Sequence, residues 1–282
     1  MKKRIIKTKK IKEKIIDLIY QANFFLPSEV EKKFKFFLDQ ESNQLARETF
    51  KIILENSVLA KKEQIPLCQD CGQVIVFLEI GQAVVFEGKI LSEVINEAVK
   101  KAYQKFYLRK SVVGDPLQRI NTMTNTPAII HFDLVRGHKV KIMVYLKGGG
   151  SENMSALKMF RPTDSPETII DYIEEAVFTA GPNPCPPIFL GIGLGGTADL
   201  ALLNAKKAVC QGVSYKNSDP FYHDLELKIM KRLNKTKIGP LGLGGKTTVA
   251  GVYIKQAPTH LATLPVALNL NCHSLRYKQV II

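Results

Sequence analysis

The sequence lacks any apolar run of the roughly 18–20 residues that a helix needs to cross a bilayer. Its basic N-terminus, MKKRIIKTKKIKEKIIDLIY, also lacks the continuous apolar stretch and the small-residue cleavage site of a secretory signal peptide. No internal repeat and no low-complexity linker is found in the 282 residues. These absences argue against a membrane or secreted protein, and we expect a cytoplasmic globular chain.

Cysteine is scarce, and the spacing of the five cysteines does not match a disulfide framework. They stand at 68, 71, 185, 210 and 272, an odd number with wide gaps, which argues for metal or catalytic thiols over a disulfide framework. Cys68 and Cys71 form a C-x-x-C pair, but no second such pair completes a zinc site. A thioredoxin-like redox pair lies at a strand-to-helix junction, whereas here a predicted helix precedes and a predicted strand follows.

Acidic residues are outnumbered, 26 against 40 Lys and Arg, which gives a net charge of +14. Residues 1–14 hold eight of the basic residues and one Glu, so about half of the excess lies in one segment, best interpreted as a solvated Lys-rich helix face. A basic body attracts small anionic substrates. No zinc-finger spacing or aromatic RNA-binding strand is present. A basic anion- or nucleic-acid-binding protein without catalysis remains an alternative.

The hydrophobic periodicity predicts an α+β fold. Apolar residues recur at helical spacing through residues 7–61, and again in 90–107, 166–179 and 219–235. A further helix is predicted directly after the turn GIGLGG. Apolar strands are predicted at 73–81, 82–89, 128–135 and 139–146. Three more are predicted, one directly before the turn GIGLGG and two after GPLGLGGKTT. We expect one domain, 1–282, with a helical N-terminal layer (1–62) packed on a mixed β-sheet core (63–282) that carries long glycine-rich loops.

Three glycine-rich segments are candidate binding loops. GIGLGG contains the G-x-G-x-x-G of a dinucleotide site, but no following strand ends in an acid. GPLGLGGKTT resembles a P-loop, but Pro240 stands where the first glycine is required. In KGGGSEN, successive backbone N–H groups of a turn can form an anion-binding concavity, and the alternative is a strained connector. His260 lies in a predicted loop between apolar strands and is a candidate site residue that can equally be structural, and Cys210 is most simply a small buried residue.

Taken together, six ordered segments resemble the iron–sulfur (class I) fumarate hydratases, above all the α subunit of their two-chain form, a family shared with L(+)-tartrate dehydratase. They run from about residue 65 to 276: PLCQDCG, LRKSVVGDPLQR with NT and TNTPA, KGGGSEN, GPNPCPPIFLGIGLGGTAD, GPLGLGGKTTVAGV and THLATLPVALNLNCHSLR. Where the family's first motif usually has threonine, this chain has Cys71. That departure leaves the role of Cys71 open.

The resemblance implies a [4Fe–4S] cluster held by three cysteines, which leaves one iron open for substrate. It implies the following site residues: Cys68, Cys185 and Cys272 as ligands, Asp70 and His260 as catalytic residues, and Gln69, Arg109 and Gly149 as substrate-binding residues. Arg109 would pair with a substrate carboxylate in fork geometry.

The resemblance also implies the reaction and the partners. The reaction is reversible hydration of fumarate to L-malate, as in the tricarboxylic acid cycle, or dehydration of L(+)-tartrate. The base would come from a separate β subunit, in a dimer of αβ pairs. A small dicarboxylate is then the ligand, and we expect neither nucleic acid nor membrane as a partner.

Overall fold

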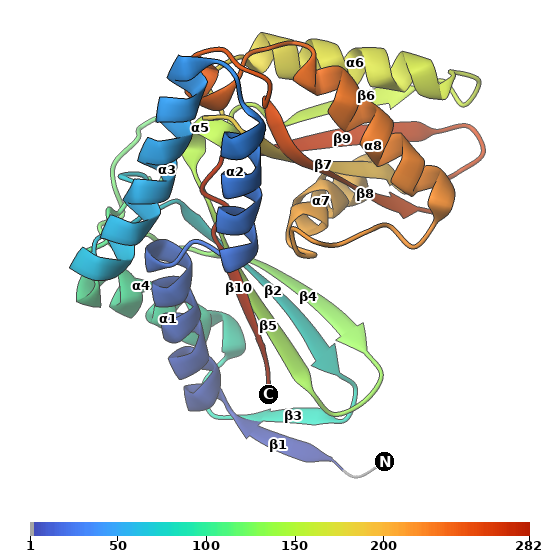
Figure 1. Ribbon diagram of the computed structural model, residues 1–282. Helices are drawn as coiled ribbons and strands as arrows, with labels where there is room; N and C mark the ends of the chain where they lie inside the picture. The colour runs from blue at the N-terminus through green and yellow to red at the C-terminus, as the bar shows by residue number, and fades with distance from the viewer. Residues whose placement is uncertain (1–2) are drawn as a thin grey trace. The chain divides into compact units, whose positions relative to one another are not determined.

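The computed structural model describes residues 3–282, which form an α+β fold of two compact units (Figure 1). Among the described residues, unit 1 comprises 3–26, 57–149 and 276–282, and unit 2 comprises 27–56 and 150–275. The α+β class is confirmed, whereas the expectation of a single domain stays a prediction. Within the described residues, no helix combines the length and apolarity that a bilayer crossing requires.

Unit 1 is built on a four-stranded mixed sheet in the order β10-β5-β2-β4. In it β2 pairs in parallel with β4 and antiparallel with β5, and a separate parallel pair joins β1 to β3. The elements of unit 1 are β1 (Arg4–Lys7), α1 (Thr8–Phe24), β2 (Gln73–Gly81), β3 (Val84–Glu87), α4 (Leu91–Lys105), β4 (Ile129–Val135), β5 (Val140–Lys147) and β10 (Tyr277–Ile281).

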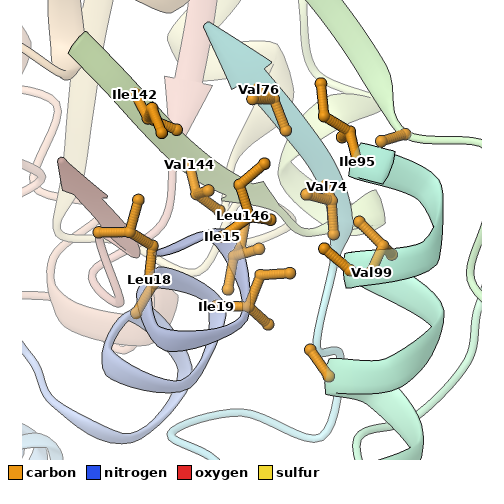
Figure 2. Packing of buried hydrophobic residues seen from close by; sticks show 14 of the residues in the cluster. Ile15, Leu18, Ile19, Val74, Val76, Ile95, Val99, Ile142, Val144 and Leu146 are labelled. Atoms are coloured by element: carbon orange, nitrogen blue, oxygen red, sulfur yellow. The ribbon is translucent and has the colours of Figure 1, made fainter. Parts of the chain in front are cut away.

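The core of unit 1 lies where α1 and α4 cover one face of this sheet (Figure 2). From α1, Ile15 and Ile19 point toward the alternate residues Val144 and Leu146 of β5, and all four are almost fully buried. Helical spacing on α1 and two-residue spacing on β5 thus present matching apolar faces, and burial of such side chains stabilises the fold by about 1.5–3 kcal/mol each.

Unit 2 contains a second mixed sheet, in the order β6-β9-β7-β8. Two of its helices begin at sequence signals, since Ser165 and Asp219 cap α6 and α8 and each is followed by proline at the first helical position. The elements of unit 2 are α2 (Ser28–Gln40), β6 (Ala156–Phe160), α6 (Pro166–Ala180), β7 (Ile188–Gly195), α7 (Ala198–Val209), α8 (Pro220–Asn234), η1 (Pro240–Gly242), β8 (Val249–Ala257) and β9 (Leu264–Asn271). Two helices, α3 (Gln44–Glu63) and α5 (Gly149–Glu152), begin in one unit and end in the other.

The glycines of GIGLGG have a packing role. Gly191 and Gly193 lie inside β7, where a Cβ would meet the carbonyl oxygens of Ala205 and Ala201 in α7 at 2.0 and 1.8 Å. The segment is therefore a strand on which a helix packs backbone to backbone. This close approach to α7 explains why Gly191 and Gly193 lack side chains.

Five elements of the described residues were not predicted from the sequence: β1, α5, β6, η1 and β10. The strands predicted at 128–135 and 139–146 are present, as β4 and β5. They are not neighbours, however, because β2 lies between them.

Candidate active site

The predicted site residues are divided between the two units. Unit 1 carries Cys68, Gln69, Asp70, Arg109 and Gly149, while unit 2 carries Cys185, His260 and Cys272. Each group is described within its own unit. In unit 1 the residues lie on the loop before β2, after the end of α4 and, for Gly149, just after β5 at the start of α5.

Asp70 is held by two backbone donors. Its Oδ1 accepts a hydrogen bond from the N–H of Gly72 at 2.9 Å, and its Oδ2 accepts one from the N–H of Gly149 at 2.7 Å. A Cβ at Gly148 would lie 3.2 Å from Asp70 Oδ2 and 3.4 Å from Arg276 Nη2, so only glycine fits this approach without displacing a neighbour. In KGGGSEN, the N–H of Gly149 at the start of α5 thus binds a carboxylate of the chain itself, that of Asp70.

Two buried side chains support the loop that carries Cys68. The hydroxyl of Tyr103 lies 2.9 Å from the carbonyl oxygen of Cys71 and 2.8 Å from that of Gly72, and burial raises the pKa of Tyr103, which keeps it a donor. Asn125 donates from Nδ2 to the Gly72 carbonyl at 3.2 Å, and its Oδ1 accepts from the N–H of Ser111 at 2.8 Å. The loop is thus fixed against the long segment 109–127.

Cys71 lies inside this arrangement. Its side chain is 2% exposed, and its sulfur accepts a hydrogen bond from the backbone N–H of Arg109 at 3.2 Å. Burial raises the pKa of the Cys71 thiol. The side chains of Gln69 and Arg109 are exposed, as ligand-binding groups need to be.

A further charged group supports the same loop. Arg276 is 1% exposed, and its Nη1 donates to the carbonyl oxygen of Asp70 at 2.6 Å. Its Nε has no hydrogen-bond partner within residues 3–282. A buried guanidinium therefore supports the backbone of Asp70, one of the predicted site residues.

In unit 2, hydrogen bonds join the segments of Cys185 and Cys272. The carbonyl oxygen of Cys185 accepts from the N–H of His273 at 3.1 Å, so the residue after Cys272 contacts Cys185 directly. Cys185 has a φ of +54°, a left-handed conformation that costs a non-glycine residue about 1–3 kcal/mol and is enriched at functional sites. Its own N–H donates to Pro182 at 2.9 Å.

His260 lies in a hollow of about 450 Å³ in unit 2, and its Nδ1 accepts a hydrogen bond from the N–H of Ala262 at 3.1 Å. Neutral imidazole bonded in this way carries its proton on Nε2. The hollow is at the carboxyl ends of β7 and β8, a usual position for ligand sites beside parallel strands. It is lined by Met159, Gly196, Thr197, Ala198, Leu200, Pro258, Thr259, His260 and Thr263.

The P-loop-like segment in unit 2 is occupied by a protein side chain. The backbone N–H of Lys246 donates to Oε2 of Glu41 at 2.6 Å, and the Lys246 ammonium donates to the carbonyl of Gln40 at 3.0 Å. Glu41 is buried, and its Oε1 accepts from the backbone of Ser42 and Asn43. The segment therefore binds a carboxylate of the chain itself and anchors the end of α2.

The five thiols fall into two classes of exposure. Cys185 is exposed and Cys68 and Cys272 are partly exposed, whereas Cys71 and Cys210 are buried; none is in a disulfide. Thiolates are the usual ligands of iron–sulfur clusters, so each accessible thiol is a candidate ligand within its own unit. Among the residues that the structure describes, no three His, Cys, Asp or Glu side chains are grouped to hold a metal ion.

Sequence reasoning did not find Tyr103, Asn125 or Arg276, which hold the loop of Cys68 from beneath. Two of them stand in segments already singled out, Asn125 within TNTPA and Arg276 at the end of THLATLPVALNLNCHSLR. A polar residue in such a motif was the available signal. Its burial and its partners depend on the tertiary structure.

Comparison with known proteins shows the family of the chain. A family model described as fumarate hydratase (Fumerase) matches residues 12–281. A protein of Methanocaldococcus jannaschii named "Putative L(+)-tartrate dehydratase subunit alpha" is 41% identical over 270 residues, which cover 93% of this chain and 94% of that one. The L(+)-tartrate dehydratase subunit alpha of Escherichia coli K12 is 27% identical over 95% of this chain and 89% of its own length. The chain therefore belongs to the fumarate hydratase (Fumerase) family and is a hydro-lyase.

Proposed function

We propose that this chain is the subunit of a hydro-lyase that holds a [4Fe–4S] cluster and, with a separate β subunit, reversibly hydrates fumarate to L-malate. The observation that carries the proposal is the exposure of the cysteines: Cys68, Cys185 and Cys272 are accessible, while the other two are buried. The hydrogen bond from His273 to Cys185 joins the segments of Cys185 and Cys272, which supports a shared role for these two cysteines. Family membership replaces the alternative of a basic binding protein without catalysis.

When bound by three thiolates, such a cluster supplies an open iron that acts as a Lewis acid toward the substrate hydroxyl and carboxylate. The chain's own residues would bind and orient the dicarboxylate. The exposed guanidinium of Arg109 offers a planar, paired set of donors that matches a carboxylate. The exposed amide of Gln69 offers both a donor and an acceptor.

We assign His260 the role of a hydrogen-bond donor. With Nδ1 accepting from Ala262, the neutral ring presents Nε2–H, which can donate to a substrate oxygen but cannot remove a proton. Asp70 has both carboxylate oxygens bound to backbone N–H groups, so we assign it the positioning of the loop and of Gly149. The base that removes the proton α to the carboxylate is then expected on the β subunit.

The names of the relatives support the separate subunit, since both are α subunits. We therefore expect an αβ pair, and a dimer of such pairs, to be the active form. The same names favour a second candidate substrate, L(+)-tartrate, a four-carbon dicarboxylate that also loses a hydroxyl group. The two candidates share the proposed ligands and differ in the groups that recognise the second hydroxyl.

The test is an anaerobic assay of the reconstituted αβ complex on fumarate, L-malate and L(+)-tartrate. We expect turnover with the complex and none with the α chain alone, and the larger kcat/KM identifies the substrate. The matched controls are Cys185→Ser, which should abolish turnover, and Cys210→Ser, which should retain it. Full activity of the α chain alone, or equal activity of the two variants, would contradict the proposal.

A further inference from the structure

Cys71 is the one cysteine near the site to which neither family resemblance nor composition gives a role. Its sulfur lies 3.2 Å from the backbone nitrogen of Arg109 and 3.9 Å from the carbonyl oxygen of Cys68. The thiol therefore bridges two segments that are 38 residues apart, one carrying a proposed iron ligand and one carrying the proposed carboxylate-binding residue.

The backbone of Arg109 needs this acceptor. Its side chain is exposed, but its N–H is directed at the 2% exposed Cys71, and the preceding Leu108 is equally buried in the core of unit 1. A buried N–H without a partner costs about 1–3 kcal/mol. Position 71 therefore requires a side chain that is small, fits among apolar neighbours and ends in a hydrogen-bond acceptor.

The same geometry argues against a ligand role. Cys71 belongs to the apolar cluster of unit 1 together with Leu108 and Ala128, whereas Cys68 is partly exposed. The Cys71 carbonyl is also fixed by the hydroxyl of Tyr103 at 2.9 Å, which holds residue 71 in its buried position. The side chain is thus directed into the protein and toward Arg109.

We propose that Cys71 is a positioning residue: its thiol fixes the backbone of Arg109, so that the guanidinium is preset to receive a substrate carboxylate, and it does not bind iron. This inference rests on the proposed function for its effect on catalysis. The hydrogen bond itself is testable without catalysis.

The test compares two variants of nearly equal shape in the αβ complex. Cys71→Thr supplies a hydroxyl acceptor, whereas Cys71→Val does not. We expect Cys71→Val to raise KM for the dicarboxylate about tenfold with little change in kcat, since about 1.4 kcal/mol corresponds to tenfold. Cys71→Thr should restore the wild-type KM, and both variants should keep the wild-type iron content.

A double-mutant cycle separates positioning from general damage. In an Arg109→Gln background, Cys71→Val should no longer raise KM, because its effect passes through the guanidinium. An undiminished increase in that background would overturn the proposal. So would equal KM values for the valine and threonine variants, or loss of iron from Cys71→Thr.

A measurement that does not depend on activity tests the hydrogen bond even if the proposed function is wrong or the valine variant folds poorly. Hydrogen exchange of the peptide spanning residues 108–112 should be faster in Cys71→Ala than in Cys71→Thr, because only the latter retains an acceptor for the Arg109 N–H. Equal exchange would overturn the positioning role. If exchange differs as expected and no substrate is turned over, the proposed function fails and the hydrogen bond stands.

Discussion

A single methyl group at Gly193 would test the packing of β7 against α7. A Cβ there lies 1.8 Å from the carbonyl oxygen of Ala201, about 1.6 Å short of the 3.4 Å at which ordinary van der Waals contact begins. The obstacle is helix backbone, so α7 must retreat or β7 must bend. Because overpacking a dense core typically costs 1–3 kcal/mol and more when backbone moves, we expect Gly193→Ala to lower the free energy of unfolding by about 3 kcal/mol.

Thermal denaturation of the purified chain measures this effect. A loss of about 3 kcal/mol corresponds to a Tm that is lower by about 6–12 °C for a unit of this size. The control is Gly114→Ala, where the nearest atom to the added methyl group is 3.8 Å away and the expected change is within about 0.5 kcal/mol. Equal Tm values for the two variants would refute the backbone packing of α7 on β7.

Two further predictions concern unit 1. The Tyr103 hydroxyl donates to the loop of Cys68, so Tyr103→Phe should lower the free energy of unfolding by about 1–2 kcal/mol in urea denaturation; an unchanged midpoint would contradict that support. Hydrogen bonds from Lys12 and Lys89 lower the pKa of Glu97 from its ordinary 4.5 to about 2. Since the folded-state value is the lower one, this stabilisation is present above about pH 4.5 and is lost as the pH falls toward 2. Glu97→Gln should therefore flatten the decline of stability over that range, and parallel curves for the two proteins would count against it.

Much of the secondary structure could be predicted because its periodicity is strong. The strand predicted at 73–81 is β2, residue for residue, and the helix predicted at 166–179 is α6 to within one residue. Both have uninterrupted apolar patterns and clear boundaries. The order of the strands could not be predicted, since it depends on pairing between distant segments: β2 lies between β4 and β5 although only four residues separate those two strands.

The glycines show where local pattern was insufficient. GIGLGG was expected to form a turn, whereas Gly191 and Gly193 lie within a strand because small residues of α7 pack against them. GPLGLGGKTT resembled a phosphate-binding loop, but the group that its backbone binds is a carboxylate from a distant segment, that of Glu41. Glycine in a sequence signals close approach, and only the tertiary structure identifies the approaching group.

The residues proposed for the site stay a prediction from motifs, whereas the residues that support their loop were not predicted. The accessible cysteines and Arg109 stand in motifs that could be recognised, but Arg276 supports the Asp70 carbonyl from 206 residues away. Buried polar residues reveal a role only through their partners. The support of the Cys68 loop by Tyr103, Asn125 and Arg276 could therefore not be predicted from the sequence alone.

The most direct test of the central claim is the iron content of the anaerobically reconstituted chain with each cysteine replaced by serine in turn. The wild-type chain should hold about four iron and four sulfide ions, as a [4Fe–4S] cluster requires. We expect Cys68→Ser, Cys185→Ser and Cys272→Ser each to lose most of that iron, and Cys71→Ser and Cys210→Ser to retain it. Iron that is lost equally from all five variants, or retained by Cys185→Ser, would contradict the assignment of the cluster to the three accessible thiols.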